Sequence, residues 1–406
     1  MLVTKTKHVL YLDSNGYQDK YGSFNWLILA GSETYTCGNE ETSDAFELLK
    51  SFITDSGSGF IPGFFSYDLK NHIESLKSLN PDHTGFPLLS FFKPELVIGE
   101  ARDGSPVLFG ETTDLIEKAS ALETADVNFP DISLKPAVSF EEYNRNFNKI
   151  KNHLLRGDIY EMNYCIHYSA TIRNINPAEL FFRLNASSPA PFACFYKSGD
   201  QYLICSSPER FMYRNGEKIV SQPIKGTAKR TGTAADEENI QFLRNDPKER
   251  AENIMITDLV RNDLSHFAEP GSVKVTELCG IYPFATVFQM TSTVEARCKQ
   301  DVNSVDILKS AFPMGSMTGV PKIRAMEIAE ELETFSRGIY SGSVGYFKSD
   351  GTFDFNVVIR SFTWNAQNGY LSLSTGSAIT EKANAAQEFQ ECQLKAAALI
   401  KILSNK

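Results

Sequence analysis

Several features that would assign a protein to a class at once are missing from this sequence. Its seven cysteines include no C-x-x-C pair, no apolar run approaches the length of a membrane span, and no internal repeat occurs. Scattered cysteines of this kind indicate reduced thiols in a cytosolic protein. The first residues also lack the apolar run of a signal peptide. Secreted disulfide-stabilised and membrane-spanning classes are therefore not expected.

An excess of positive charge is also missing. Lysine and arginine number 40 against 50 aspartate and glutamate residues, which gives a formal net charge of -10. A nucleic-acid-binding protein would carry a basic stripe, so we expect no nucleic-acid partner. With 406 residues, the chain is long enough to bury a sizeable core.

The pattern of the chain changes near residue 135. Residues 1–135 contain short apolar segments and loops, and the stretch ALETADVNFPDISLKPAVS at the change has weak periodicity and two prolines, which is typical of a linker. Residues 136–406 have sharper patterns. We therefore expect an amino-terminal region, 1–135, followed by a main domain, 136–406.

The main domain is predicted to open with a helix and a long strand. Ser139 and Glu142 form a capping box, apolar residues follow at helical spacing, and Gly157 is a helix-ending residue. From Ile159 to Ile172 apolar and polar residues then alternate. This alternation predicts a strand with one apolar and one polar face.

A predicted hairpin brings two candidate catalytic residues near each other. Asn215 and Gly216 form a tight turn into the strand EKIVSQPIK, which predicts Lys225 at a strand end, and Glu209 precedes the hairpin. An acid and an amine in one pocket, or a plain salt bridge, fit this arrangement equally well. For Lys225 alone a solvated lysine is the simpler interpretation, because a nucleophilic lysine needs a lowered pKa.

Charged residues further along suggest a metal site and an anion site. Glu249 with Glu252, and Glu388 with Glu391, each form a Glu-x-x-Glu pair on one face of a predicted helix. Two such faces together would supply the oxygen ligands that Mg²⁺ prefers, although such pairs more often lie on solvated faces. Arg360 interrupts an apolar strand and needs a partner, for which a bidentate carboxylate is the natural choice.

Eight segments occur in an order that resembles the chorismate-utilising enzymes. They are GDIYEMNY, SSPERF, PIKGTAKR, ERAENIMITDLVRNDL, GSMTGVPKIRAMEI, RGIYSGSVGY, VVIRSF and EFQECQLKAA. The family includes anthranilate synthase component I, aminodeoxychorismate synthase component I, and the isochorismate and salicylate synthases. The resemblance covers residues 139–403. It implies an α+β fold, in which two antiparallel β-sheets pack face to face with helices outside, and to which the amino-terminal region adds strands.

Lys225 distinguishes the branches of this family. The anthranilate branch has alanine there, whereas a lysine in PIKGT resembles the aminodeoxychorismate synthase branch. The resemblance implies that Lys225 attacks C2 of chorismate as the C4 hydroxyl leaves, and that ammonia then attacks C4 and displaces the lysine. The implied product is 4-amino-4-deoxychorismate, a precursor of 4-aminobenzoate and folate. The isochorismate branch uses a base lysine where this chain has Glu161.

The resemblance also implies roles for the other candidate residues. Glu209 matches the general acid, and Thr227 matches a hydroxyl beside the reacting centre. The carboxylates implied for magnesium are Glu252 and Glu391, which match direct ligands, and Glu249 and Glu388, which match ligands acting through water. The positions implied for binding substrate are Ser316, Tyr340, Arg360, Gly376 and Lys395.

Two positions depart from the family pattern. Gln289 stands where many relatives have a histidine, and an amide can hydrogen-bond but cannot take a proton at neutral pH. We therefore expect Gln289 only to position substrate. Glu161 stands where ammonia-using relatives commonly have glutamine. Its extra charge would face the substrate site, where it would either help deprotonate ammonium or pair with Lys225.

No glutaminase motif, a nucleophilic cysteine in a G-x-C-x-G turn, occurs in the chain. Ammonia is therefore expected from free ammonium or from a separate glutamine amidotransferase subunit, and the product would pass to an aminodeoxychorismate lyase. Two alternatives remain, anthranilate synthase component I and a regulator that binds chorismate without catalysis. The presence of Glu209, Lys225 and the metal carboxylates argues against the regulator.

Overall fold

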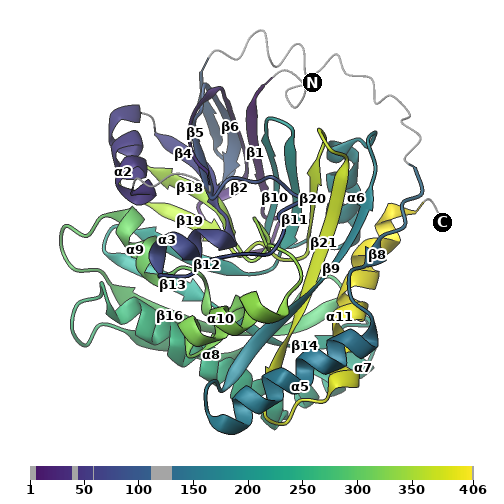
Figure 1. The fold of residues 1–406 in the computed structure, drawn as a ribbon. Helices are drawn as coiled ribbons and strands as arrows, with labels where there is room; N and C mark the ends of the chain where they lie inside the picture. Colours follow the sequence, from purple (N-terminus) through teal and green to yellow (C-terminus); the bar gives the residue numbers. More distant parts are fainter. Residues whose placement is uncertain (1–5, 39–43, 58, 111–129, 405–406) are drawn as a thin grey trace.

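The two sheets of the protein lie between outer helices in the computed structural model, which describes residues 6–38, 44–57, 59–110 and 130–404 (Figure 1). Residues 121–129 of the predicted linker lie outside the described residues, and the domain boundary near 135 stays a prediction. The predicted α+β class with two antiparallel sheets is confirmed.

The first sheet combines strands from both ends of the described chain, and its strands pair in antiparallel fashion. Its order is β17 (Gly319–Val320), β9 (Glu161–Thr171), β21 (Tyr370–Thr380), β20 (Ser361–Asn365), β11 (Gln201–Ser207), β10 (Phe192–Ser198), β1 (His8–Asp13), β2 (Phe24–Gly31), β6 (Leu96–Ala101) and β7 (Pro106–Phe109), with β8 (Lys135–Pro136) beside β9.

The second sheet is likewise antiparallel and mixes early and late strands. Its order is β14 (Ile224–Lys229), β16 (Val287–Arg297), β13 (Lys218–Gln222), β12 (Arg210–Asn215), β19 (Phe353–Asn356), β18 (Ser343–Lys348), β4 (Phe60–Phe65), β5 (Leu89–Lys93) and β3 (Glu33–Cys37), with β15 (Lys274–Pro283) beside β16.

The sheets pack through aromatic and aliphatic side chains on their inner faces. Phe64 of β4 meets Tyr196 of β10 edge to face, with ring centroids 5.1 Å apart, and both belong to one buried cluster with Leu29 and Leu203. Offset and edge-to-face pairs of this kind add to the free energy gained by burying apolar surface. This cluster joins the two sheets into one body.

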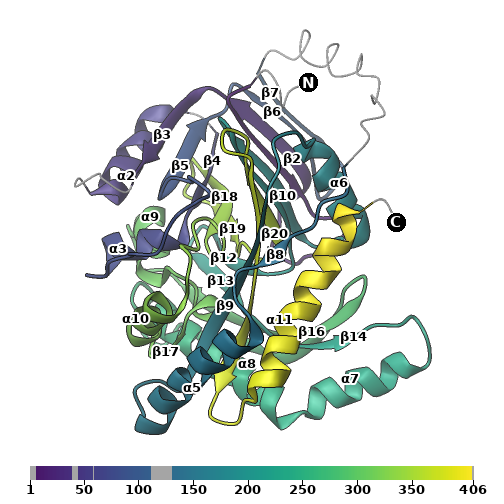
Figure 2. The same cartoon turned by 45° about the vertical axis from the view of Figure 1, so that its right-hand side comes forward.

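Helices cover the outer faces and gather at one end, as Figures 1 and 2 show. Helices α5 (Phe140–Arg156), α6 (Pro177–Ser187) and α11 (Ala385–Ile400) pack on the first sheet, and α2 (Ala45–Ser56), α8 (Pro247–Ser265) and α9 (Ser304–Ala311) pack on the second. The remaining described helices are α3 (Lys70–Ile73), α7 (Ala235–Asn245), α10 (Lys322–Leu332) and the 3₁₀ segments η1 (Tyr67–Leu69), η2 (Gly315–Met317) and η3 (Lys401–Leu403).

The sequence signals at the start of the main domain are confirmed. Ser139 caps α5 by accepting a hydrogen bond from the backbone N–H of Glu142, and Gly157 ends the helix with φ of 78°. Strand β9 follows as predicted. Its polar face is not solvated, because the strand is buried on both faces from Glu161 to Tyr168. Its polar side chains must therefore find partners inside the protein.

All seven cysteines are buried thiols. In the part of the chain that the structure describes, no helix combines the length and apolarity that a membrane crossing would require.

Candidate active site

Lys225 lies on a short strand of the second sheet, and one detail of its prediction is wrong. The expected strand EKIVSQPIK is divided at Pro223, which has no N–H to donate, so Lys225 is the second residue of the separate strand β14 rather than a strand end. The pairing of β14 with β16 shifts between Ile224 and Thr227. This bulge contains Gly226 at φ of 96°, and such bulges re-aim neighbouring side chains.

Three carboxylates surround the ammonium of Lys225, whose side chain is 11% exposed. The nearest is Glu161 of β9 in the opposite sheet, with Oε1 at 3.0 Å. Burial acts to lower the pKa of Lys225, but Glu161, Glu252 and Glu209 together raise it above its ordinary value. The three carboxylates therefore favour the ammonium form of Lys225.

Glu209 lies between β11 and β12 and is 3% exposed. Burial raises the pKa of its carboxyl to about 7, against the opposing effects of Ser316 and Lys225. A carboxyl with this pKa is partly protonated at neutral pH. Such a group can donate a proton, which agrees with the acid role implied for Glu209.

Asn253, which no sequence pattern singled out, fixes helix α8 against the strand of Lys225. Its side-chain N–H group donates to the carbonyl oxygens of Lys225, at 3.2 Å, and Met290, at 3.0 Å. Its own oxygen accepts from the hydroxyl of Ser292. Because Asn253 is adjacent to Glu252, these bonds hold that carboxylate in a set position relative to Lys225.

The four glutamates predicted to bind metal lie on α8 and α11, near one another. Glu252 and Glu388 are 6% and 2% exposed. Burial raises the pKa of Glu252 to about 8, against the opposing charge of Lys225, and burial also raises the pKa of Glu249 and Glu388, with Glu391 adding to both shifts. Burial is the main cause of these shifts and repulsion among the carboxylates adds to it, so a bound cation would favour the ionised carboxylates.

The fit of these residues to a magnesium ion rests on their chemistry. Among the described residues no three His, Cys, Asp or Glu side chains are already grouped around a common metal position. However, Oε1 of the buried Glu252 has no hydrogen-bond partner there. An oxygen-only set with a buried, unpartnered carboxylate oxygen fits a hard divalent cation. Gly226 leaves room for this arrangement, since a Cβ there would lie 3.1 Å from Oε2 of Glu249.

The predicted substrate-binding residue Lys395 contacts one of the four glutamates. Lys395 of α11 donates to the carbonyl of Gly376 at 2.9 Å and pairs with Glu391 at 2.6 Å. Burial acts to raise the pKa of Glu391, but Lys395 lowers it overall. Tyr340 is 5% exposed.

Arg360 has no carboxylate partner among the described residues. It forms no ion pair with any of the described residues, and burial lowers its pKa. Its backbone lies in the left-handed region, with φ of 53°, as does that of Ser341, with φ of 64°. Non-glycine residues held in this region cluster at functional sites. A partly buried guanidinium without a protein carboxylate is suited to bind the carboxylate of a ligand.

Several buried polar atoms in this region have no partner. Among the buried side-chain oxygens without a hydrogen-bond partner in the described residues, three belong to predicted site residues: Oε2 of Glu161, Oε1 of Glu252 and Oε1 of Gln289. Gln289 pairs directly across from Thr227, between β16 and β14. Because unsatisfied buried groups are costly, their concentration indicates a place where a polar ligand completes the bonding.

A buried ion pair supports the site from behind β9. Arg337 donates from Nε to Glu333 at 2.8 Å and from its two Nη groups to the carbonyls of Met317, at 2.7 Å, and Asn163, at 3.1 Å. Glu333 also accepts from the backbone N–H of Cys165. The pair therefore joins β9 to the segment after Ser316. The Glu-x-x-x-Arg spacing of this pair is visible in the sequence, but such spacing is common on helices and does not by itself indicate a functional site.

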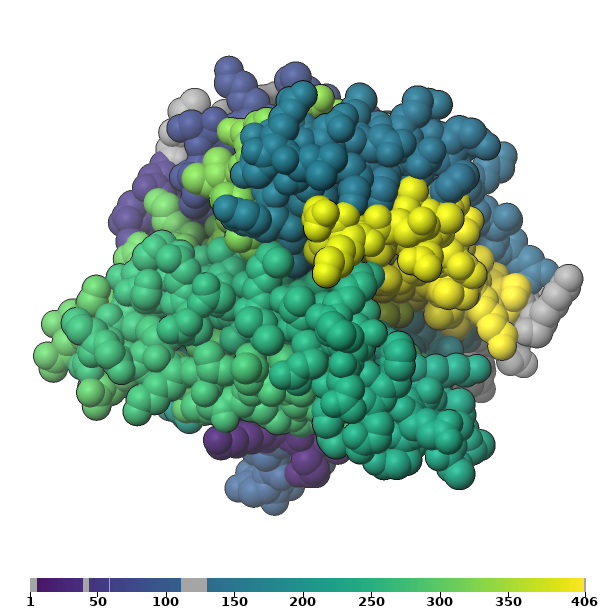
Figure 3. Space-filling model, turned by 90° about the horizontal axis from the view of Figure 1, so that it is seen from below, coloured from purple at the N-terminus to yellow at the C-terminus, as the bar shows by residue number. Residues whose placement is uncertain are grey.

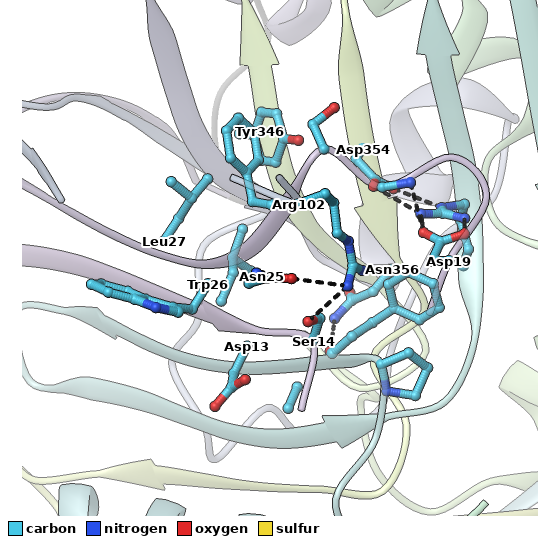
Figure 4. Close-up of a pocket in the computed structure, with 18 of the residues that line it drawn as sticks. Asp13, Ser14, Asp19, Asn25, Trp26, Leu27, Arg102, Tyr346, Asp354 and Asn356 are labelled. Carbon is cyan, nitrogen blue, oxygen red and sulfur yellow. Dashed lines mark hydrogen bonds and ion pairs between the residues drawn. The ribbon is translucent and has the colours of Figure 1, made fainter. Parts of the chain in front are cut away.

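A separate cavity of about 60 Å³ lies next to Arg210, the residue after Glu209 (Figure 4). Arg210 is fully buried and donates to Asp354 at 2.9 Å and to Asp19 at 3.0 Å. Arg102 enters from the other side and donates to Tyr17 O at 2.7 Å. Room for a few water molecules is left. This charged network fixes the backbone that carries Glu209.

The fold and the site thus define an enzyme whose buried polar residues lie between two sheets and border a carboxylate cluster. The chain belongs to the chorismate-binding enzyme family, whose model matches residues 7–401.

Curated relatives come from two branches of this family. Aminodeoxychorismate synthase component 1 of Klebsiella aerogenes is 42% identical over 255 residues, which cover 63% of this chain and 56% of that protein. Aminodeoxychorismate synthase component 1 of Escherichia coli K12 is 33% identical over 84% of this chain and 76% of its own length. Anthranilate synthase component 1 of Thermus thermophilus is 32% identical over 84% of this chain and 77% of its own length.

Solved structures share the fold at low sequence identity. Anthranilate synthase component I from Streptococcus pneumoniae superposes with a TM-score of 0.84 at 24% identity, over 95% of this chain and 93% of that one. The menaquinone-specific isochorismate synthase of Escherichia coli superposes with a TM-score of 0.78 at 16% identity, over 99% and 90%. The architecture is therefore common to relatives with different products.

Proposed function

We propose that the protein converts chorismate and ammonia to 4-amino-4-deoxychorismate, for 4-aminobenzoate and folate synthesis. The observation that carries the proposal is the position of Lys225, buried between Glu161 and Glu209 within a pocket of unpartnered polar atoms. The curated relatives named aminodeoxychorismate synthase component 1 support the same reaction. The similarity to anthranilate synthase component 1 makes anthranilate synthesis the alternative function.

In the proposed first step Lys225 passes a proton to Glu161, and the neutral amine then forms a bond to C2 of chorismate. The C1=C2 and C5=C6 double bonds of the ring shift to C1=C6 and C4=C5, and the C4–O bond breaks. Glu209 gives its proton to the departing hydroxyl, which leaves as water. The raised pKa of Glu209 suits this task, because the group retains its proton near neutral pH.

In the second step ammonia forms a bond to C4, and the C2–N bond to Lys225 breaks. The proton lost by the new ammonium group returns to Glu209, so the lysine amine and the acid are both restored. Arg360, Tyr340 and the backbone near Gly376 hold one substrate carboxylate during both steps. Gln289 and Ser316 bind polar groups of the ring and the hydroxyl of Thr227 lies beside it.

Mg²⁺ is the proposed cofactor. Glu252 and Glu391 would bind it directly, and Glu249 and Glu388 would hold its water molecules. When bound, the ion supplies positive charge that holds and neutralises the ring carboxylate of the substrate.

The proposed ammonia source is a separate glutamine amidotransferase subunit, which the words "component 1" in the names of the relatives support. An aminodeoxychorismate lyase would consume the product. A cytosolic setting is supported by the buried thiols, which suit a reducing compartment.

One incubation separates the candidate functions. The purified protein is given chorismate, Mg²⁺ and ammonium at alkaline pH, with and without aminodeoxychorismate lyase. We expect 4-aminobenzoate only when the lyase is present. Anthranilate and pyruvate formed without the lyase would assign the other branch. Bound but unchanged chorismate would assign a regulator.

A further inference from the structure

Lys248 places a positive charge among the carboxylates that are proposed to bind Mg²⁺. It precedes Glu249 on α8, and its Nζ lies 3.0 Å from Oε1 of Glu388 on α11 and 3.8 Å from Oε1 of Glu252. In the space-filling view from below, the yellow residues of the α11 region border the green residues of the α7–α8 segment (Figure 3). The lysine therefore joins the two helices that carry the four glutamates.

The two glutamates that Lys248 contacts differ from it in exposure. Glu388 and Glu252 are almost completely buried, whereas the side chain of Lys248 is 41% exposed. A lysine on a flexible four-carbon stem can turn into solvent without disturbing its helix. The glutamates cannot do the same, so any cation that binds them must take the place of this ammonium.

We propose that Lys248 is an internal competitor for the divalent cation, and that metal binding requires its ammonium to leave Glu388 and Glu252. The inference rests on the proposed magnesium site. In the absence of metal, Lys248 holds α8 and α11 together and offsets the repulsion among their carboxylates. The observed affinity for the metal is then lower than the intrinsic affinity of the carboxylates, because part of the binding free energy is used to break the ion pairs of Lys248.

The expected size of this reduction follows from the exposure of the pair. Partly exposed ion pairs change an equilibrium by a factor of up to about five to ten, and this pair has a second carboxylate within reach. Replacing Lys248 with methionine keeps the length of the side chain and removes the charge. We therefore expect Lys248→Met to bind Mg²⁺ about tenfold more tightly than the wild type.

The test is isothermal titration calorimetry of Mg²⁺ into the full-length protein at low ionic strength, without chorismate. Lys248→Arg keeps the charge and should bind no more tightly than wild type. Lys218→Met is the matched control, because Lys218 has a similar exposure, 43%, and pairs with Glu295 at 2.8 Å, on the strand pair β13–β16. Its affinity for Mg²⁺ should not change.

Thermal unfolding gives a second readout that does not depend on activity. In EDTA, Lys248→Met should melt below the wild type, because its buried carboxylates have lost their counter-ion. Saturating Mg²⁺ should raise its melting temperature by more than that of the wild type. Lys218→Met should show the same increase on Mg²⁺ addition as the wild type.

The outcomes separate this inference from the magnesium proposal. Equal or weaker Mg²⁺ binding by Lys248→Met, with binding abolished in Glu252→Gln, would leave the metal site in place and overturn the role of Lys248. Absence of Mg²⁺ binding in all variants at millimolar concentrations, with and without chorismate, would overturn both. Tighter binding in Lys248→Met alone supports the inference.

Discussion

The ammonium of Lys225 lies 3.0 Å from Oε1 of Glu161, and the two residues belong to different sheets. Glu161 is 1% exposed, and its second oxygen, Oε2, has no hydrogen-bond partner among the described residues. The pair therefore links the two sheets, and the charge of Glu161 raises the pKa of the proposed nucleophile. A lysine must lose a proton before it can attack carbon.

Glu161→Gln should lower the pKa of Lys225. Glu161 is the strongest of the carboxylates that raise this pKa, so removing its charge makes the neutral amine more accessible at a given pH. The measurement is competitive labelling with acetic anhydride as a function of pH, read by mass spectrometry at Lys225. The midpoint should move to lower pH in the variant. An unchanged midpoint would show that Glu161 does not control this proton.

Lys225→Ala should lose activity by about a hundredfold or more, because ammonia would have to attack without the covalent step. Lys229→Ala, at the exposed end of the same strand, is the control and should keep wild-type activity. In addition, wild-type protein quenched with chorismate and no ammonia should carry substrate mass on the peptide that contains Lys225. Full activity of Lys225→Ala and an unmodified peptide would reject the lysine mechanism.

Glu209→Gln should change how stability depends on pH. The pKa of Glu209 is raised from 4.5 to about 7, so between these values the unfolded chain releases a proton that the folded protein keeps. Wild-type stability therefore falls as pH rises from about 4.5 to 7, and the variant lacks this loss. Over that interval the wild type should lose up to about 3 kcal/mol of unfolding free energy relative to the variant.

Urea unfolding at pH 5 and pH 8 checks this prediction, with thermal melting as a second measure. Activity of the variant should be low at both values, because glutamine cannot donate the proton that the leaving hydroxyl needs. A stability difference that stays constant with pH would contradict the raised pKa.

Glu252→Gln and Glu391→Gln should each abolish turnover that depends on Mg²⁺, while the fold persists. Each change removes one of the two carboxylates proposed to bind the ion directly. Glu331→Gln, at an exposed position on α10, is the control. Circular dichroism and initial rates across a range of Mg²⁺ concentrations provide the measurement. Full wild-type activity in excess EDTA would remove the metal from the mechanism.

The purified chain should use ammonium but not glutamine. Its ammonium-dependent rate should rise with pH, because only free ammonia can attack C4, and glutamine should support activity once an amidotransferase subunit is added. The assay compares both nitrogen sources with and without that subunit. Glutamine-dependent product from the single chain would contradict the need for a partner.

Elements fixed by local chemistry could be predicted from the sequence. The cap at Ser139 and the glycine stop at Gly157 produce helix α5 where it was expected. The hairpin at Asn215 and Gly216 also forms. In each case a few adjacent residues determine the backbone, so no knowledge of distant contacts is needed.

Features that depend on distant contacts could not be predicted. The sequence left two roles open for Glu161, deprotonating ammonium or pairing with Lys225, and the 3.0 Å ion pair matches the second. The sequence could not predict the pKa of Lys225, because burial lowers it and three carboxylates from different elements raise it. Lys248 and Asn253 likewise look ordinary on a helix until their partners on other elements are known.

The pairing of β9 with β21, from Glu161 to Thr171 with Tyr370 to Thr380, determines when the pocket can exist. On a ribosome Glu161, Glu209 and Lys225 emerge early, whereas β21 and α11 are made much later. Until they dock, the nascent chain lacks Gly376 and Lys395, two of the residues proposed to bind substrate. If the proposed roles hold, Lys225 can react only in a chain synthesised through α11, and a proteolytic cut that releases α11 should abolish its activity.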